Sequence, residues 1–210
     1  MSDLEPGRST VSDGSVRDTR TRLLDAALEL FWFGGYERTS LAEVCREAGA
    51  NPGSLYHFFP SKEALLEAVL ERLLETIHDG LVGPAWEGVD DPVERIFALL
   101  AAYRRSLQMT DLTYGCPVGS LSLEWRDPPE GVRRGLVANF EAWTGVVRAC
   151  LEEARERFPT DTDLDGLATF VLTTMEGAVM QARTFRSLEP FDRSMAALRD
   201  YFERLEAPVG

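Results

Sequence analysis

The chain has 210 residues, of which 44% are hydrophobic and 27% charged, and its formal net charge is −13. These proportions are ordinary for a globular protein of one or two domains. No apolar run approaches the roughly 18 residues of a membrane span, and three widely spaced cysteines argue against a disulfide framework and a Cys-x-x-Cys metal site. We therefore expect a cytoplasmic protein with no membrane segment, no metal and no cofactor.

The first segment, residues 1–16, is polar and lacks the apolar core of a signal peptide. It is typical of a disordered arm. The next segment, residues 17–62, is neutral, because six basic residues balance six acidic ones. Nearly all the excess acid therefore lies elsewhere, and a polyanion could approach this end of the chain.

Residues 17–62 contain the start and stop signals of three helices. The apolar stripe in 19–33 predicts a half-buried helix that ends at Gly34-Gly35. Ser40 and Glu43 have the spacing of a capping box that opens a second helix, which Gly49 stops. Asn51 suits an N-cap and Pro52 a first helical position, so a third short helix follows at once. Two helices joined so tightly predict a helix-turn-helix.

The third helix has one small, polar face. With Leu55 turned inward, Phe58 and Phe59 lie close to the same side and are expected to anchor it. The opposite side carries Gly53 and His57, flanked by Ser54 and Tyr56. Such a surface suits the major groove of DNA, where a helix reads base edges.

Hydroxyl groups and the only lysine of the chain flank this helix. Thr39 and Ser40 lie at the start of the second helix. Ser61 and Lys62 lie at the start of a long helix, "KEALLEAVL". Helix N-termini favour phosphate groups, so these residues are candidate contacts to a DNA backbone. A surface role without DNA contact remains an alternative for His57.

The stretch "RTRLLDAALELFWFGGYERTSLAEVCREAGANPGSLYHFFPSKEALLEAVL" resembles the N-terminal domain of the TetR family of bacterial regulators. Gly35-Tyr36, Thr39-Ser40, the "LYHFF" run and "SKEAL" carry the resemblance. It implies a homodimer that binds a palindromic double-stranded DNA operator and a small-molecule inducer. It also implies phosphate contacts from Thr39, Ser40, Tyr56 and Lys62. The major-groove contacts that it implies are Asn51, Pro52, Gly53, Ser54 and His57.

This sequence departs from many relatives at two of these positions. They have a serine and a lysine where this chain has Asn51 and Pro52. The contact that such a lysine would make is absent, so the operator sequence of a relative does not transfer to this chain.

Residues 63–210 predict a helical ligand-binding and dimerisation domain, for about nine helices in the whole chain. After the long helix we expect helices at 92–109, 118–126, about 128–157, 164–187 and from Pro190 onward. Helix 164–187 is apolar on several sides, which fits contacts to its own core and to a partner. The last two helices are therefore expected to form an isologous dimer interface.

The aromatic residues of this domain are numerous enough to line a pocket as well as a core. The expected ligand-binding residues are Tyr103, Cys116, Trp125, Phe140, Trp143 and Met175. Glu176 lies in an apolar stretch and is either a satisfied structural carboxylate or a cation-binding group. His78, near a helix end, is expected to face the helix dipole.

Cys116 raises a second possibility. The segment "YGCPVGSLSLE" also resembles a loop of one TetR subgroup, some of whose members respond to electrophiles or oxidants. A sensor thiol needs exposure and a lowered pKa, whereas a buried, inert cysteine is the commoner case. Both readings stay open from the sequence.

The predicted function is that of a ligand-responsive transcriptional regulator, most simply a repressor released from its operator by a small molecule. The alternatives are a redox- or electrophile-sensing repressor acting through Cys116, and a ligand-binding helical protein without specific DNA binding. An enzyme is not expected, because the chain has two histidines, no His-Glu-x-x-His motif and no Walker-type glycine loop.

Overall fold

The structure, a computed structural model, describes residues 13–206, with side chains from residue 19 onward. Every regular element in that range is a helix and none is a strand, which confirms the predicted all-α class. No described helix is both long and apolar enough to cross a bilayer. The chain divides into two compact units, Met1–Val69 and Leu70–Gly210. This boundary lies inside a helix, seven residues beyond the expected division at residue 62.

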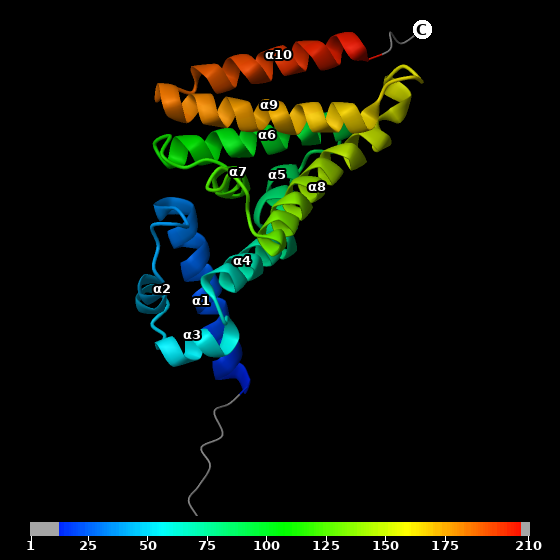
Figure 1. Ribbon diagram of the computed structural model, residues 1–210. Helices are drawn as coiled ribbons and strands as arrows, with labels where there is room; N and C mark the ends of the chain where they lie inside the picture. Colours follow the sequence, from blue (N-terminus) through cyan, green and yellow to red (C-terminus); the bar gives the residue numbers. More distant parts are fainter. Residues whose placement is uncertain (1–12, 207–210) are drawn as a thin grey trace, which may run out of the picture. The chain divides into compact units, whose positions relative to one another are not determined.

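The N-terminal unit is a helix-turn-helix domain. It contains α1 (Asp13–Gly34), α2 (Leu41–Glu47), α3 (Pro52–Phe58) and the first turns of α4 (Lys62–Ile77). Helix α1 packs against both α2 and α3, which also contact each other (Figure 1). Their apolar faces meet in a core that includes Leu23, Ala27, Phe31, Val44, Leu55, Phe59, Leu65 and Leu66.

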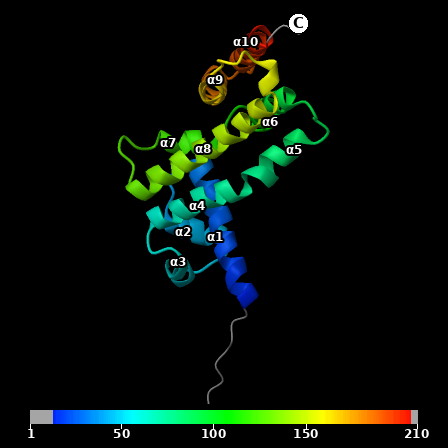
Figure 2. The same ribbon diagram turned by 90° about the vertical axis from the view of Figure 1, so that its right-hand side faces the viewer.

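The C-terminal unit continues from the end of α4 and is helical throughout its described part. Its elements are η1 (His78–Val82), α5 (Gly83–Trp86), α6 (Pro92–Met109), α7 (Pro117–Ser122), α8 (Glu130–Glu153), η2 (Arg155–Arg157), α9 (Leu164–Phe185) and α10 (Glu189–Leu205). Helix α9 packs against α8, α6 and α10, and α9 and α10 run side by side, seen along their length in Figure 1 and almost end-on in Figure 2.

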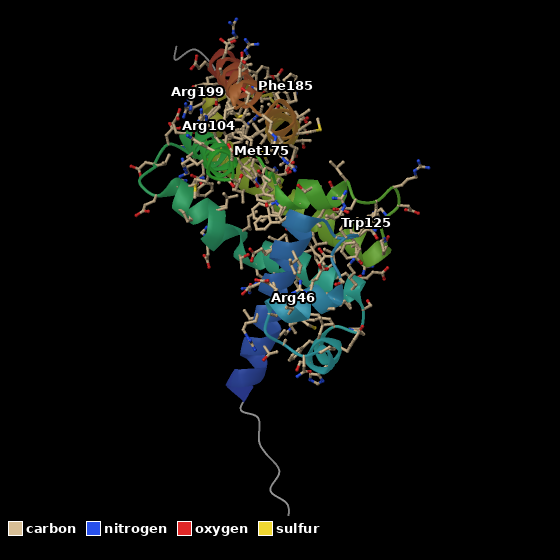
Figure 3. The ribbon with its side chains drawn as sticks, turned by 90° about the vertical axis from the view of Figure 1, so that its left-hand side faces the viewer. Arg46, Arg104, Trp125, Met175, Phe185 and Arg199 are labelled. Carbon is tan, nitrogen blue, oxygen red and sulfur yellow. The ribbon has the colours of Figure 1, made fainter. Side chains whose placement is uncertain are left out.

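Helix α10 is also tied to α6 by two arginine–carboxylate pairs. Arg104 donates to both carboxylate oxygens of Asp192, at 2.6 and 2.9 Å, and Arg199 donates to both oxygens of Glu94, at 2.6 and 3.0 Å. Figure 3 labels the two arginines. The pairs are partly exposed, so each contributes at most about 1 kcal/mol. Their two-point geometry fixes the position of α10 along α6.

Several helix bounds differ from the predicted ones. Helix α1 begins at Asp13 instead of residue 19, so the expected arm 1–16 is helical over its last four residues, and residues 1–12 lie outside the described range. No proline interrupts this stretch, and a nucleated helix extends readily. Helix α8 starts at Glu130, because Pro129 has the extended backbone of an N-cap, and ends at Glu153.

The stretch between α4 and α6 is more regular than the sequence indicates. A π-helical segment, η1, continues from α4 and leads into the single turn α5. Gly80, Gly83 and Pro84 suggest a loop here. Val82 and Ala85 nevertheless pack with Leu99 of α6 in a small apolar cluster, and this packing outweighs the local preference.

Candidate nucleic-acid interface and effector pocket

Helix α3 begins and ends where its sequence directs. The Oδ1 atom of Asn51 accepts a hydrogen bond of 2.8 Å from the Ser54 N–H, and Pro52 occupies the first helical position. At the other end, Phe59 has extended backbone (φ −133°), as the residue before Pro60 must. Leu55 is fully buried and holds the helix against the N-terminal core.

The opposite face of α3 is open to solvent. Asn51, Pro52, Gly53, Tyr56 and His57 are exposed, and Ser54 is half-buried. The predicted orientation of this face is therefore confirmed. One expectation was wrong in degree, since Phe58 is half-buried and only Phe59 is a full core anchor.

Thr39 and Ser40 differ in what their hydroxyl groups can do. Thr39 is buried, and its hydroxyl donates to the carbonyl oxygens of Gly35 (2.9 Å) and Leu30 (3.1 Å). With its single proton engaged, it is a poor donor to a phosphate. We therefore correct its expected role: Thr39 fixes the turn between α1 and α2. Ser40 is exposed and forms the predicted capping box with Glu43.

Lys62 is tethered at the start of α4. Its Nζ atom lies 3.4 Å from the Glu37 carbonyl oxygen and 4.2 Å from the centre of the Tyr36 ring. An ammonium group has three donors, so this tether leaves capacity for a further acceptor. Burial, with the charges of Glu63 and Glu37, raises the pKa of Tyr36 to about 12, so Tyr36 stays neutral beneath the lysine.

The C-terminal unit contains a pocket of about 500 Å³ between α7, α8 and α9. Its walls are mostly apolar, with a few polar groups. The lining residues are Cys116, Gly119, Ser120, Ser122, Leu123, Phe140, Leu172, Thr173, Glu176, Gly177, Val179, Met180 and Arg183.

Two of the six expected ligand-binding residues, Cys116 and Phe140, line this pocket. The structure does not bring the others to its wall. Trp143 and Met175 belong to the buried core, packed among apolar residues of the neighbouring helices. Tyr103 packs against that core. Trp125 follows α7, in the segment that leads to α8.

Cys116 is the N-cap of α7 and is buried. Its sulfur accepts from the Gly119 N–H at 3.5 Å, and the Tyr103 hydroxyl lies 4.0 Å away. The Trp143 Nε1–H in turn donates to the Tyr103 oxygen at 3.1 Å. Burial, followed by the charge of Glu176, raises the pKa of the Cys116 thiol to about 12. These surroundings are opposite to those of a sensor thiol.

The "GCPVG" segment lies tightly against α9. A Cβ atom on Gly115 would lie 2.7 Å from Val179 Cγ1, and one on Gly119 would overlap the carboxylate of Glu176. Glycine is needed at Gly115 for this close approach, and at Gly119 a larger residue would displace the end of the Glu176 side chain. The four-residue spacing of the two glycines was a signal for this close approach, but the expected ligand-binding residues did not include Gly119, Val179 or Arg183.

Comparisons with known proteins agree with this architecture. Residues 23–69 match the family "Bacterial regulatory proteins, tetR family", and residues 92–198 match "Tetracyclin repressor-like, C-terminal domain". LmrA of Bacillus subtilis (strain 168), an HTH-type transcriptional regulator, is 28% identical over 191 residues, covering 90% of this chain and 100% of LmrA.

Two solved structures are similar in fold and sequence. Reduced NemR of Escherichia coli, an HTH-type transcriptional repressor, has a TM-score of 0.76 at 28% identity, covering 92% of this chain and 100% of NemR. A cysteine mutant of the regulator CifR, complexed with a 26-base-pair operator DNA, has a TM-score of 0.70 at 29% identity, covering 93% and 98%. The chain therefore belongs to the TetR family of helix-turn-helix transcriptional regulators.

Proposed function

We propose that this regulator is a repressor whose homodimer binds a palindromic operator and leaves it when a small molecule fills the pocket between α7, α8 and α9. The observation that carries the proposal is the exposed polar face of α3, held by a capped start and a buried Leu55. NemR, which is similar along nearly its whole length, is a repressor. This similarity supports repression over activation for this chain.

The contacts to DNA fall into two classes. Asn51, Gly53 and His57 face outward on α3 and are suited to base edges in the major groove, where Pro52 and Ser54 would add close packing. Ser40, Tyr56 and Lys62 are suited to phosphates. In a symmetric dimer the two α3 helices would enter successive major grooves about 34–36 Å apart.

The dimer would form through α9 and α10. Phe170, Met180 and Phe185 are exposed apolar residues of α9. Residues 170, 173, 177, 180 and 184 recur every three or four positions and so share one face of this helix. A Cβ atom on Gly177 would meet nothing within 4 Å, so a second helix could approach closely there. An apolar helix face of this kind is typical of a protein interface.

The pocket suits an apolar effector of moderate size, since ligand sites commonly measure about 300–1,000 Å³ and are lined by apolar side chains. Its contact with α9 places an effector beside the helix of the proposed dimer face. An effector releases DNA only if it binds better to the conformation that cannot bind the operator.

The test is a comparison of two variants on a duplex selected from a random pool. We expect His57→Ala to lower the preference for the selected duplex over random DNA by about tenfold. Lys62→Ala should weaken binding to both duplexes alike. It should also reduce the salt slope, that is, the slope of the logarithm of the binding constant against the logarithm of the salt concentration, by about one unit, because one phosphate contact is lost. Mobility shifts at several salt concentrations measure both effects.

The matched control is Arg105→Ala, which removes one positive charge from an exposed position on α6. It should leave the salt slope unchanged. If the parent selects no duplex, or if both variants bind both duplexes as the parent does, the alternative of a ligand-binding protein without specific DNA contact holds instead.

A further inference from the structure

Glu176 stands out among the pocket residues. Its Oε1 atom is buried and has no hydrogen-bond partner within the described residues. We propose that Glu176 is the recognition group for a protonated amine, so that the effector is an apolar molecule with one cationic nitrogen. This inference rests on the proposed function, in that the pocket between α7, α8 and α9 is the effector site.

The surroundings of Glu176 leave the carboxylate in need of a partner. Among residues 19–206, no arginine, lysine or histidine forms an ion pair with it, and the neighbouring donor is the Cys116 thiol, which is a weak one. Arg183 lines the same pocket, but its Nε–H donates to the carbonyl oxygen of Thr113 at 3.1 Å. A carboxyl group that is buried without such a partner is costly, and each missing hydrogen bond costs about 1–3 kcal/mol.

The position of Glu176 in the wall is built by its neighbours. Gly119 has no Cβ atom, and this leaves room for the carboxylate beside α7. Leu172 and Val179 of α9 and Phe140 of α8 line the same space, so the apolar body of a ligand would lie against them. An aliphatic or aromatic chain that ends in an ammonium group matches this arrangement of one acceptor and several apolar surfaces.

The electrostatics favour a cation over a neutral or anionic ligand. Burial raises the pKa of the Glu176 carboxyl above its ordinary value. An ammonium group beside the carboxylate would lower that pKa again and would gain more from a low-dielectric pocket than from water. Of the other ionisable groups around the pocket, Cys116 and Tyr103 are weak acids whose raised pKa values keep them neutral. The cation of the pocket wall, Arg183, forms no ion pair with Glu176, and its Nε–H donates to the Thr113 carbonyl oxygen.

The experiment uses the full chain and three probes with one apolar body: 4-phenylbutylamine, 4-phenylbutanol and 4-phenylbutyrate. Calorimetry at pH 7 should show that the amine binds about tenfold more tightly than the alcohol, as for a charge-assisted hydrogen bond. The isosteric Glu176→Gln variant should bind the amine and the alcohol equally. Glu141→Gln, at an exposed position on α8, removes the same charge and should keep the preference.

A second variant keeps the charge but moves it. The new Cβ atom of Gly119→Ala would occupy the place of the Glu176 carboxylate, so this variant should also lose most of the amine preference. A proton measurement adds an independent readout. Because burial raises the pKa of Glu176 and the amine would lower it again, amine binding should release protons where the free carboxyl is still partly protonated. This release is seen as a dependence of the binding heat on buffer ionisation enthalpy, and Glu176→Gln should abolish it.

Three results would overturn the inference: no binding of the amine, equal binding of amine and alcohol by the parent, or an amine preference that survives in Glu176→Gln. Tighter binding of the butyrate would assign the pocket to an anion held by Arg183. The proposed function fails separately. If the amine binds through Glu176 but leaves operator affinity unchanged, the amine site stands and effector release does not.

Discussion

Burial governs the ionisation of the Cys116 thiol, at the start of α7, and of the Glu176 carboxyl, on α9. Cys116 and Glu176 are neighbours. The charge of Glu176 raises the pKa of the thiol further, whereas the hydrogen bond from the thiol partly offsets the rise in the pKa of the carboxyl that burial causes. The loop sequence alone left a reactive cysteine open as an alternative, because a cysteine before a helix can have a lowered pKa. The structure places the sulfur inside the protein beside an acidic group, and that environment has the opposite effect.

We therefore expect Cys116 to react slowly with iodoacetamide. At pH 8 a thiol with a pKa of about 12 is ionised about a thousandfold less than an ordinary thiol. The rate should rise about tenfold for each pH unit up to that pKa. Peptide mass spectrometry after timed alkylation measures the rate for this residue alone.

The control for this measurement is the same cysteine in urea, where the thiol regains its ordinary pKa. A native rate within a few fold of the denatured rate would revive the reading of Cys116 as an electrophile sensor.

Single residues also show the limit of sequence reasoning about sites. The outward direction of His57 and Tyr56 follows from helical periodicity and was predicted correctly. Periodicity does not say whether a hydroxyl is already engaged, as for Thr39, or whether an inward residue such as Met175 faces a cavity or another helix. Those answers depend on which elements pack together.

At the scale of elements, helix starts marked by a capping side chain were the best predicted features because their signals are local. The side chains of Ser40, Asn51 and Asp91 accept hydrogen bonds from backbone N–H groups within the next three residues. The π-helical η1 and the turn α5 had no such signal. They exist because Val82 and Ala85 pack on α6, a contact between segments that the sequence does not reveal.

Substitutions at Asn51, the N-cap of α3, can separate effects on stability from effects on DNA affinity. Asp and Asn are equally good N-caps, so Asn51→Asp should keep the thermal unfolding temperature within a few degrees of the parent. The new negative charge would lie on the exposed start of α3, where we propose that DNA binds. Affinity for every duplex should then fall by at least about tenfold.

Asn51→Ser is the matched control, because serine keeps the cap without adding charge. Thermal unfolding and mobility shifts on both variants make the comparison. Unchanged DNA affinity in Asn51→Asp would place the DNA-binding surface away from α3.

For the whole molecule, the structure of the N-terminal unit could be predicted from the sequence more fully than that of the C-terminal unit. The helix-turn-helix is one continuous stretch whose motif spacing predicted its fold and its exposed face. The pocket of the C-terminal unit draws on α7, α8 and α9. An excess of aromatic residues indicated that such a pocket could exist but not which helices form it. Cys116 and Phe140 line it, whereas the other four expected residues, Tyr103, Trp125, Trp143 and Met175, do not.

The proposed dimer gives a prediction at this scale. Phe185→Glu places a charge at the C-terminal end of α9, next to residue 184 of the proposed dimer face, at a side chain that is 69% exposed in the single chain. In a dimer this site would be apolar and buried, so the variant should sediment as a monomer and bind the selected duplex at least about a hundredfold more weakly.

Met109→Glu is the control, since Met109 at the end of α6 is 86% exposed and lies off that face of α9. It should remain dimeric in sedimentation velocity. A Phe185→Glu protein that is still dimeric at micromolar concentration would move the interface elsewhere.

The two glycines around Cys116 have a consequence for anyone who wishes to redesign this regulator. Because Gly115 and Gly119 lie directly against Val179 and Glu176, the loop and the helix can change only as a pair. Enlarging the loop at Gly115 would therefore require a compensating substitution at Val179, whereas at Gly119 the end of the Glu176 side chain can move aside. Mutant libraries confined to Gly115 should yield mostly misfolded clones.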